Sequence, residues 1–177
     1  MTTLTAIPEL ETERLILRGF RQDDLDDLLV IESDPDVTRF TGGVQSRDRI
    51  WRFMAAMVGH WSLRGFGPFA IVGKDEEKVI GFCGPWYPVR WPEPEICWTF
   101  GKAHQGKGYA TEAARRAITY VYETLNWETV MSPIDAKNFA SQGVAKKLGA
   151  TLEAQDLTFE DFTVDIWRHV PAREWHA

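Results

Sequence analysis

The sequence contains few cysteines and no apolar run long enough to cross a bilayer. Cys83 and Cys97 are the only cysteines in 177 residues, too few for the disulfide framework of a small secreted domain. Both lie in apolar, strand-like stretches, so we expect buried, reduced thiols. A membrane-spanning helix needs about 20 apolar residues, and residues 1–10 lack the pattern of a secretion signal. We therefore expect a cytoplasmic protein with no membrane partner.

The sequence also lacks a surplus of positive charge. It has 20 Lys and Arg residues against 26 Asp and Glu residues, a formal net charge of −6. Binding to a polyanion normally requires a basic face, so we expect no nucleic-acid partner. Linkers, repeats and low-complexity tracts are missing too, while 44% of the residues are hydrophobic. The chain is therefore predicted to fold as a single domain over residues 1–177.

Apolar periodicity predicts an alternation of helices and strands. Capping residues mark the helix ends: Ser46 or Asp48 begins the second helix, Gly65 closes it, and Asn138 begins the last one. Helices are predicted from residue 25 to near residues 34–35, from residue 46 or 48 to residue 65, over residues 110–125, and after residue 138. Strands are predicted over residues 14–20, 69–72, 79–83, 95–100 and 129–134 and within 152–170.

The stretch from His104 to Thr111 lies between a predicted strand and a predicted helix. Gly106 and Gly108 allow a tight turn and a close approach of backbone to a ligand. The first N–H groups of a helix lack internal partners and favour anions. Residues 102–116 carry four basic side chains against one acidic. These features favour a diphosphate site, although a Gly-x-Gly in such a turn is often only a turn.

Two common nucleotide motifs nearly match this stretch and fail. Residues 101–107 follow P-loop spacing, but Gly108 occupies the position where Ser or Thr would coordinate magnesium. The dinucleotide fingerprint fails because Thr111 replaces its third glycine. Neither a P-loop enzyme nor a dinucleotide-binding enzyme is expected.

Gln105-x-x-Gly108-x-Ala110 resembles the pyrophosphate loop of the GNAT N-acetyltransferase superfamily. The segment from Asn138 through Ser141 to Gly149 is similar to that family's second coenzyme A segment. Residues 11–18 look like the start of its RimJ/RimL-like (Acetyltransf_3-type) branch. The resemblance extends from about residue 11 to residue 150.

This resemblance implies a mixed α/β (α+β) GNAT acyl-CoA N-acyltransferase fold. That fold has a mostly antiparallel central sheet of six or seven strands, flanked by about four helices. The sheet splays between its fourth and fifth strands, here residues 95–100 and 129–134, and pantetheine inserts there as a pseudo-strand. The branch also makes a homodimer a possible assembly.

The implied function is transfer of acetyl from acetyl-CoA, used as a co-substrate without a metal, to a primary amine. The amine attacks directly in a ternary complex, so neither cysteine is a nucleophile. Neutralising an α-amine at pH 7 costs about 1 kcal/mol and neutralising a lysine about 4.6. This favours a protein or peptide N-terminus, or a small molecule with a low-pKa amine. The implied coenzyme A contacts are Trp98, Thr99, Phe100, Gln105, Gly106, Lys107, Gly108, Tyr109, Ala110, Thr111, Asn138 and Ser141.

Glu95 is the candidate general base, because many relatives carry an acid in a pattern similar to Glu-Ile-x-Trp. The alternative is that Glu95 only pairs with a surface arginine. The tyrosine that often protonates the leaving thiolate is absent, since Ala145 occupies its position. Ser141, or a water held by it, is the substitute, unless Ser141 only contacts coenzyme A. A catalytically weak acyl-CoA-binding module is therefore the alternative function.

Three tryptophans are candidates for contact with the acceptor. Trp51 lies in the second predicted helix, where helical spacing also suits a core position, as it does for Trp61. Trp86 and Trp91 lie in residues 84–94, a stretch rich in Pro and Trp that we expect to be a loop. These aromatic residues form either a wall of the acceptor site or a patch for dimerisation.

Overall fold

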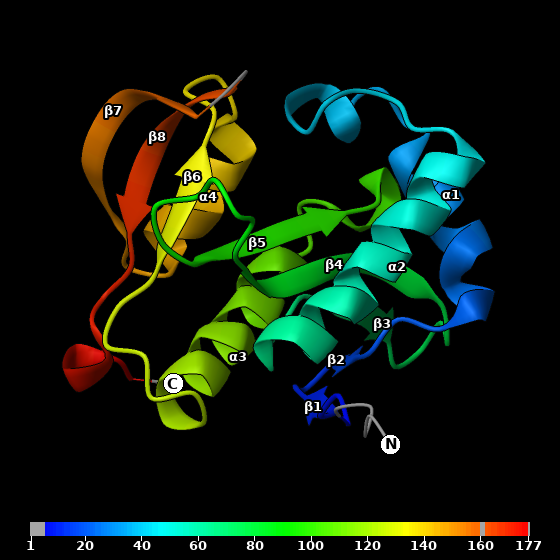
Figure 1. Ribbon diagram of the computed structural model, residues 1–177, viewed down its shortest axis with the longest axis horizontal. Coiled ribbons are helices and arrows are strands. Elements are labelled where there is room, and N and C mark those ends of the chain that lie inside the picture. Colours follow the sequence, from blue (N-terminus) through cyan, green and yellow to red (C-terminus); the bar gives the residue numbers. More distant parts are fainter. Residues whose placement is uncertain (1–5, 160–161, 177) are drawn as a thin grey trace.

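The computed structural model describes residues 6–159 and 162–176. In these two ranges eight strands form one sheet, in the order β1-β2-β3-β4-β5-β6-β8-β7 (Figure 1). All neighbouring described strands are antiparallel except β5 and β6. The strands are β1 (Leu10–Glu11), β2 (Leu15–Arg18), β3 (Phe69–Gly73), β4 (Val79–Trp86), β5 (Glu95–Phe100), β6 (Met131–Ile134), β7 (Thr151–Phe159) and β8 (Phe162–Arg168).

Four α-helices and four short 3₁₀ helices occur in the described ranges. Ser46 caps the second helix by accepting a hydrogen bond from the Arg49 N–H, and Gly65 ends it with φ at 77°. The last helix begins at Asn138, whose side chain accepts from the Ser141 N–H. These predicted helix ends are confirmed. The helices are α1 (Leu25–Glu32), α2 (Arg47–Arg64), α3 (Tyr109–Glu123), α4 (Phe139–Lys147), η1 (Gln22–Asp24), η2 (Thr38–Phe40), η3 (Lys102–His104) and η4 (Ala172–Glu174).

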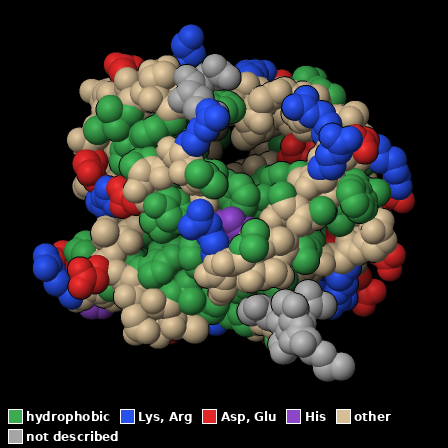
Figure 2. Space-filling view, in the orientation of Figure 1, with side chains coloured by type: hydrophobic (Ala, Val, Ile, Leu, Met, Phe, Trp, Pro, Cys, Tyr) green, Lys and Arg blue, Asp and Glu red, His purple; other side chains and the backbone are tan. Residues whose placement is uncertain are grey.

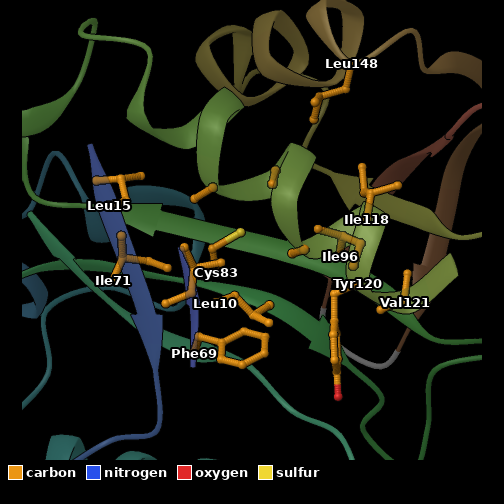
Figure 3. Packing of buried hydrophobic residues seen from close by; sticks show 14 of the residues in the cluster. Leu10, Leu15, Phe69, Ile71, Cys83, Ile96, Ile118, Tyr120, Val121 and Leu148 are labelled. Atoms are coloured by element: carbon orange, nitrogen blue, oxygen red, sulfur yellow. The ribbon is translucent and has the colours of Figure 1, made fainter. Parts of the chain in front are cut away.

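The sheet buries both of its faces. Alternation along β3 sends Ile71 toward α3, where it joins a core that includes Ile96 and Ile118 (Figure 3). The neighbouring Ala70 and Val72 point to the opposite face, which is covered by α1 and α2. Two hydrophobic layers therefore hold β2–β5 rigidly, and β5 is fixed at the centre of the sheet.

Two details of the expected fold are corrected. The sheet has eight strands rather than six or seven, and one of them is the short β1. The strand predicted over 79–83 continues to Trp86, with Pro85 opposite Ile96. β3 begins with Phe69, opposite Cys83, so no strand pairs with β4 on that side beyond this point. Proline is tolerated at such an edge because no ladder hydrogen bond is lost.

The predicted splay between residues 95–100 and 129–134 is confirmed. β5 and β6 run parallel but share a single residue pair, Glu95 with Met131. Beyond this pair β6 turns away and joins β8, and Figure 1 shows β6, β7, β8 and α4 together at one end of the molecule. A wedge therefore opens between β5 and β6. In the described ranges, no helix is both long and apolar enough to cross a membrane.

Candidate active site

A cavity of about 610 Å³ begins in this wedge and extends beneath α2 and the 87–94 loop. Figure 2 shows the surface hollowed between the two ends of the molecule, with hydrophobic side chains around the opening. The wedge is lined by Trp98, Ser132, Pro133, Ile134, Asn138 and Ser141. We call the other half the aromatic chamber; its walls include Phe53, Met57, Phe82, Trp86, Trp91 and Phe159.

Glu95 lies where the wedge and the aromatic chamber meet. It is the first residue of β5 and is 7% exposed. Burial raises the pKa of Glu95 to about 8, and the nearby Trp91 indole offsets only part of this increase. Glu95 forms no ion pair within the described ranges. Arg168, on strand β8, donates to both carboxylate oxygens of Glu93, at 2.7 and 2.5 Å.

The loop before α3 has the backbone geometry of an anion site. Gly106 and Gly108 have φ of 74° and 85°, in the left-handed region that favours glycine. Gly108 is the residue from which α3 begins. In the described part of the chain, the six N–H groups of residues 106–111 donate to no protein acceptor. A row of free amides therefore faces outward at the positive end of a helix dipole.

Side chains distant in the sequence hold this loop in place. The Arg14 guanidinium donates to the Lys107 carbonyl at 3.0 Å and to Glu112 at 2.7 Å, and it lies 4.5 Å from the centre of the Tyr109 ring. Burial opposes ionisation of Glu112, but hydrogen bonds from Thr12 and Arg14 outweigh it and lower the pKa of Glu112. Sequence reasoning missed Arg14, because no local pattern links positions 98 residues apart.

The local excess of basic residues is smaller than the sequence suggests. Lys102 pairs with Asp36, and His104 lies 3.0 Å from Glu76. Lys107 remains exposed on the loop. The loop therefore offers an anion mainly backbone N–H groups rather than a cluster of lysines.

The backbone of β5 faces the wedge only at alternate residues. The Ile96 carbonyl accepts from Ser132 of β6 at 2.6 Å, so Ile96 faces the wedge. By alternation Trp98 does so as well, whereas the Thr99 carbonyl faces β4, close to Gly81. The Phe100 carbonyl already accepts from the Gln105 side chain at 3.0 Å. Of the three strand residues predicted to hold pantetheine, Trp98 has the best backbone position.

A buried Ser132–His169 pair lies at the narrow end of the wedge and was missed from the sequence. Ser132 donates its single proton to the Ile96 carbonyl, so His169 Nε2 must donate to Ser132 Oγ, at 2.9 Å. Burial lowers the pKa of His169 to about 4. The imidazole is therefore neutral near pH 7 and helps to fix the point at which β5 and β6 separate.

Ser141 and Asn138 reach the wedge from the first turn of α4. The Ser141 N–H donates to the Asn138 side chain at 3.1 Å. The Trp98 indole N–H donates to Ser141 Oγ at 3.3 Å. Because Ser141 accepts from Trp98, its hydroxyl proton stays available for a group in the wedge.

The candidate tryptophans fall in different places. Trp86 and Trp91 line the aromatic chamber. The ring centres of Trp86 and His60 lie 4.6 Å apart, and those of Trp91 and Phe159 lie 5.3 Å apart. Trp51 is 48% exposed on α2 and is not part of the cavity lining, whereas Trp61 is in the core at 1% exposure. On α2, Phe53 rather than Trp51 reaches the chamber.

Both cysteines are free thiols; Cys83 is buried as expected, whereas Cys97 is only partly buried and lines the cavity. Burial raises the pKa of both Cys83 and Cys97, and the nearby Glu95 carboxyl adds to the effect at Cys97. Their reactive thiolate forms are therefore disfavoured. Within residues 6–159 and 162–176, no group of three or more His, Cys, Asp and Glu side chains is arranged to hold a metal ion.

The Acetyltransferase (GNAT) domain family matches residues 14–151. The chain is 35% identical over 140 residues to the uncharacterized N-acetyltransferase p20 of Bacillus licheniformis, covering 75% of this chain and 76% of the relative. It superposes on the acetyltransferase from Agrobacterium tumefaciens strain C58 with a TM-score of 0.84 and 29% identity, covering 93% and 95% of the two chains.

The fold extends to more distant proteins. The ribosomal-protein-S5-alanine acetyltransferase from Vibrio fischeri superposes with a TM-score of 0.68 at 19% identity, covering 96% of this chain and all of that one. The family match, the identity to p20 and the geometry of the loop and wedge agree with one another. This chain belongs to the GNAT acetyltransferase family.

Proposed function

We propose that this protein transfers an acetyl group from acetyl-CoA to a primary amine. The observation that carries the proposal is the row of six free backbone N–H groups at the start of α3, next to a wedge that leads to Glu95. Such a helix terminus binds a diphosphate through its amides and its dipole. Gly106 has no neighbouring atom within 4 Å of the Cβ position, so phosphate oxygens have room to approach.

The wedge suits an extended amide-containing chain such as pantetheine. The Trp98 backbone faces the wedge, where β6 has already separated from β5. Pairing with this edge and with Asn138 or Ser141 holds the thioester in one orientation. Holding two reactants in line contributes about 7–11 kcal/mol to lowering a barrier, so positioning is the main contribution of this chain.

Acetyl-CoA supplies the activated acetyl group. The amine nitrogen forms a bond to the acetyl carbon, and the carbon–sulfur bond breaks. The proton lost by the nitrogen passes to Glu95, directly or through a water, and the departing sulfur receives a proton from Ser141 or a water bound to it. Because the pKa of Glu95 is about 8, the basic form increases as the pH rises toward 8.

One set of measurements tests the proposal. Titration calorimetry with acetyl-CoA and with free coenzyme A measures binding, and mass spectrometry detects acetylation across a panel of amines and peptides. We expect binding of both forms and acetylation of at least one amine. Binding without transfer to any amine would instead support an acyl-CoA-binding module. Ala145 is the reason to retain that alternative, since it is fully buried and offers no phenol to the wedge.

The sequence also supports a proposal about the compartment, assembly and partners of the protein. We propose a cytoplasmic enzyme, with a homodimer as its possible assembly and without a nucleic-acid or membrane partner. Sedimentation analysis of the purified chain measures the assembly state directly.

A further inference from the structure

The aromatic chamber is built almost entirely from apolar side chains. Phe53 of α2 packs on Phe82 of β4 with ring centres 5.0 Å apart. Trp86 lies four residues further along β4, on the same face as Phe82. Trp91 and Phe159 also pack on each other, with ring centres 5.3 Å apart. A ligand that reaches Glu95 from this side therefore passes between aromatic rings.

The charged side chains that line the cavity do not suit a ligand with several positive charges. Its described lining contains two acidic side chains, Glu95 and Asp135, and one basic side chain, Arg90. Asp135 directly follows β6, on the wedge side, and accepts from the Lys137 N–H at 2.7 Å. Among the described lining residues, Glu95 is therefore the one acid on the side of the chamber. Polyamines and aminoglycosides carry several ammonium groups, each of which would need a partner on binding.

The chamber also offers little to a peptide backbone. An extended peptide binds by pairing with a free strand edge. Beyond Cys83, residues 67–68 lie against β4, since a Cβ added to Gly84 would lie 3.0 Å from the Cα of Pro68 and 3.3 Å from the Gly67 carbonyl oxygen. The other edge of β4 pairs with β5 up to Trp86. Apolar rings form the remaining walls, so a peptide that entered would leave its N–H and C=O groups unpaired.

We propose that the acceptor is a small primary amine with a single positive charge and a compact aromatic or apolar body. Its body lies among Phe53, Phe82 and Trp86, and its nitrogen meets Glu95. This inference rests on the proposed acetyltransferase function and identifies its substrate class. Burying one phenyl ring in such a chamber corresponds to a preference of roughly 10- to 150-fold over an amine without the ring.

Four amines of graded chemistry test the substrate class. The rates of acetylation of 2-phenylethylamine, ethylamine, spermidine and an alanine-terminated tetrapeptide are compared at one acetyl-CoA concentration. We expect kcat/KM to be at least ~10-fold higher for 2-phenylethylamine than for each of the others. Higher kcat/KM for spermidine or the peptide would overturn the substrate class but leave the acetyltransferase proposal intact. Absence of acetylation of all four, and of any amine in a wider panel, would overturn both.

Variants of the chamber walls test whether the preference for 2-phenylethylamine arises in the aromatic chamber. Phe53→Ala and Trp86→Leu each remove a ring, and Leu63→Ala on α2 is the matched control because Leu63 is 87% exposed. We expect the KM for 2-phenylethylamine to rise about 5- to 50-fold in either chamber variant, with the acetyl-CoA Kd unchanged. That unchanged Kd verifies that each variant is folded. Unchanged KM in both chamber variants, with coenzyme binding intact, would overturn the inference.

Discussion

The loop before α3 and the aromatic chamber are built in different ways. The loop, residues 105–111, is a continuous stretch that is largely exposed and presents backbone N–H groups. The chamber assembles side chains from α2, β4, the 87–94 loop and the β7–β8 pair. One site therefore depends on backbone conformation and the other on the identity of distant side chains.

This difference separates what is common to the reaction from what is specific to the acceptor. Backbone N–H groups are the same for nearly every residue, so a loop that uses them needs only the right φ and ψ values. Side-chain walls change with every substitution, and a buried carboxyl such as Glu95 depends on its surroundings for its pKa. Mutations in the chamber should alter chemistry and selectivity, and mutations in the loop should alter affinity for acetyl-CoA.

The largest expected effect is that of Glu95→Gln in an acetylation assay. Removing a general base lowers the rate by about 10²- to 10⁴-fold, and we expect this loss in kcat/KM for 2-phenylethylamine while the Kd for acetyl-CoA stays the same. The ratio of wild-type to variant rates should grow with pH up to about 8, the pKa of Glu95. A ratio that is constant between pH 6 and 9 would remove Glu95 from the mechanism.

The same variant tests the raised pKa of Glu95 through protein stability, without an activity assay. Folding raises the pKa of Glu95 from 4.5 to about 8, so between these values the folded state holds a proton that the unfolded state has released. Wild-type stability therefore falls as the pH rises through this window. Relative to wild type, Glu95→Gln should gain ~3–5 kcal/mol in free energy of unfolding between pH 4 and pH 9.

Urea unfolding at several pH values measures this gain. Glu123→Gln is the control, because Glu123 is exposed at the end of α3 and no comparable gain is expected. Parallel stability curves for wild type and Glu95→Gln would contradict a raised pKa of Glu95.

A smaller effect is expected when the loop conformation is disturbed by Gly108→Val. Gly108 has φ of 85°, and a β-branched residue there costs about 1–3 kcal/mol in strain. We expect the Kd for acetyl-CoA to rise by ~10-fold or more, with little change in selectivity among amines. Gly59→Ala is the control, since it lies in α2 with no atom within 4 Å of the added Cβ. Equal affinity in both variants would argue against a backbone-built site.

The smallest effect is expected from Lys107→Gln, which changes a loop side chain and leaves the backbone unaltered. Exposed charges contribute about 0–1 kcal/mol, so the Kd for acetyl-CoA should rise by no more than ~5-fold, and the difference should shrink at high salt. Calorimetry at low and high ionic strength measures it. A loss as large as that of Gly108→Val would mean that the loop acts through its lysine rather than its amides.

Local sequence was sufficient to predict the loop, the helix caps and most strands. Gly106, Gly108 and Asn138 act on residues within one helical turn, so their effects are visible in the adjacent sequence. The family resemblance supplied the wedge between residues 95–100 and 129–134. The extension of β4 to Trp86 was not predicted, because it depends on where β3 begins and on pairing with β5.

By itself the sequence determined where the chain turns, which helix end carries free amides, and that Glu95 opens the central strand. Only the tertiary structure decided that Phe53 rather than Trp51 faces the cavity, that Arg14 secures the loop of residues 105–111, and that Ser132 and His169 fix the point of the wedge. The physical reason is the distance along the sequence between the residues that interact. Backbone turns and caps are set by neighbouring residues, whereas burial, pKa and packing are set by side chains that meet only after the sheet has formed.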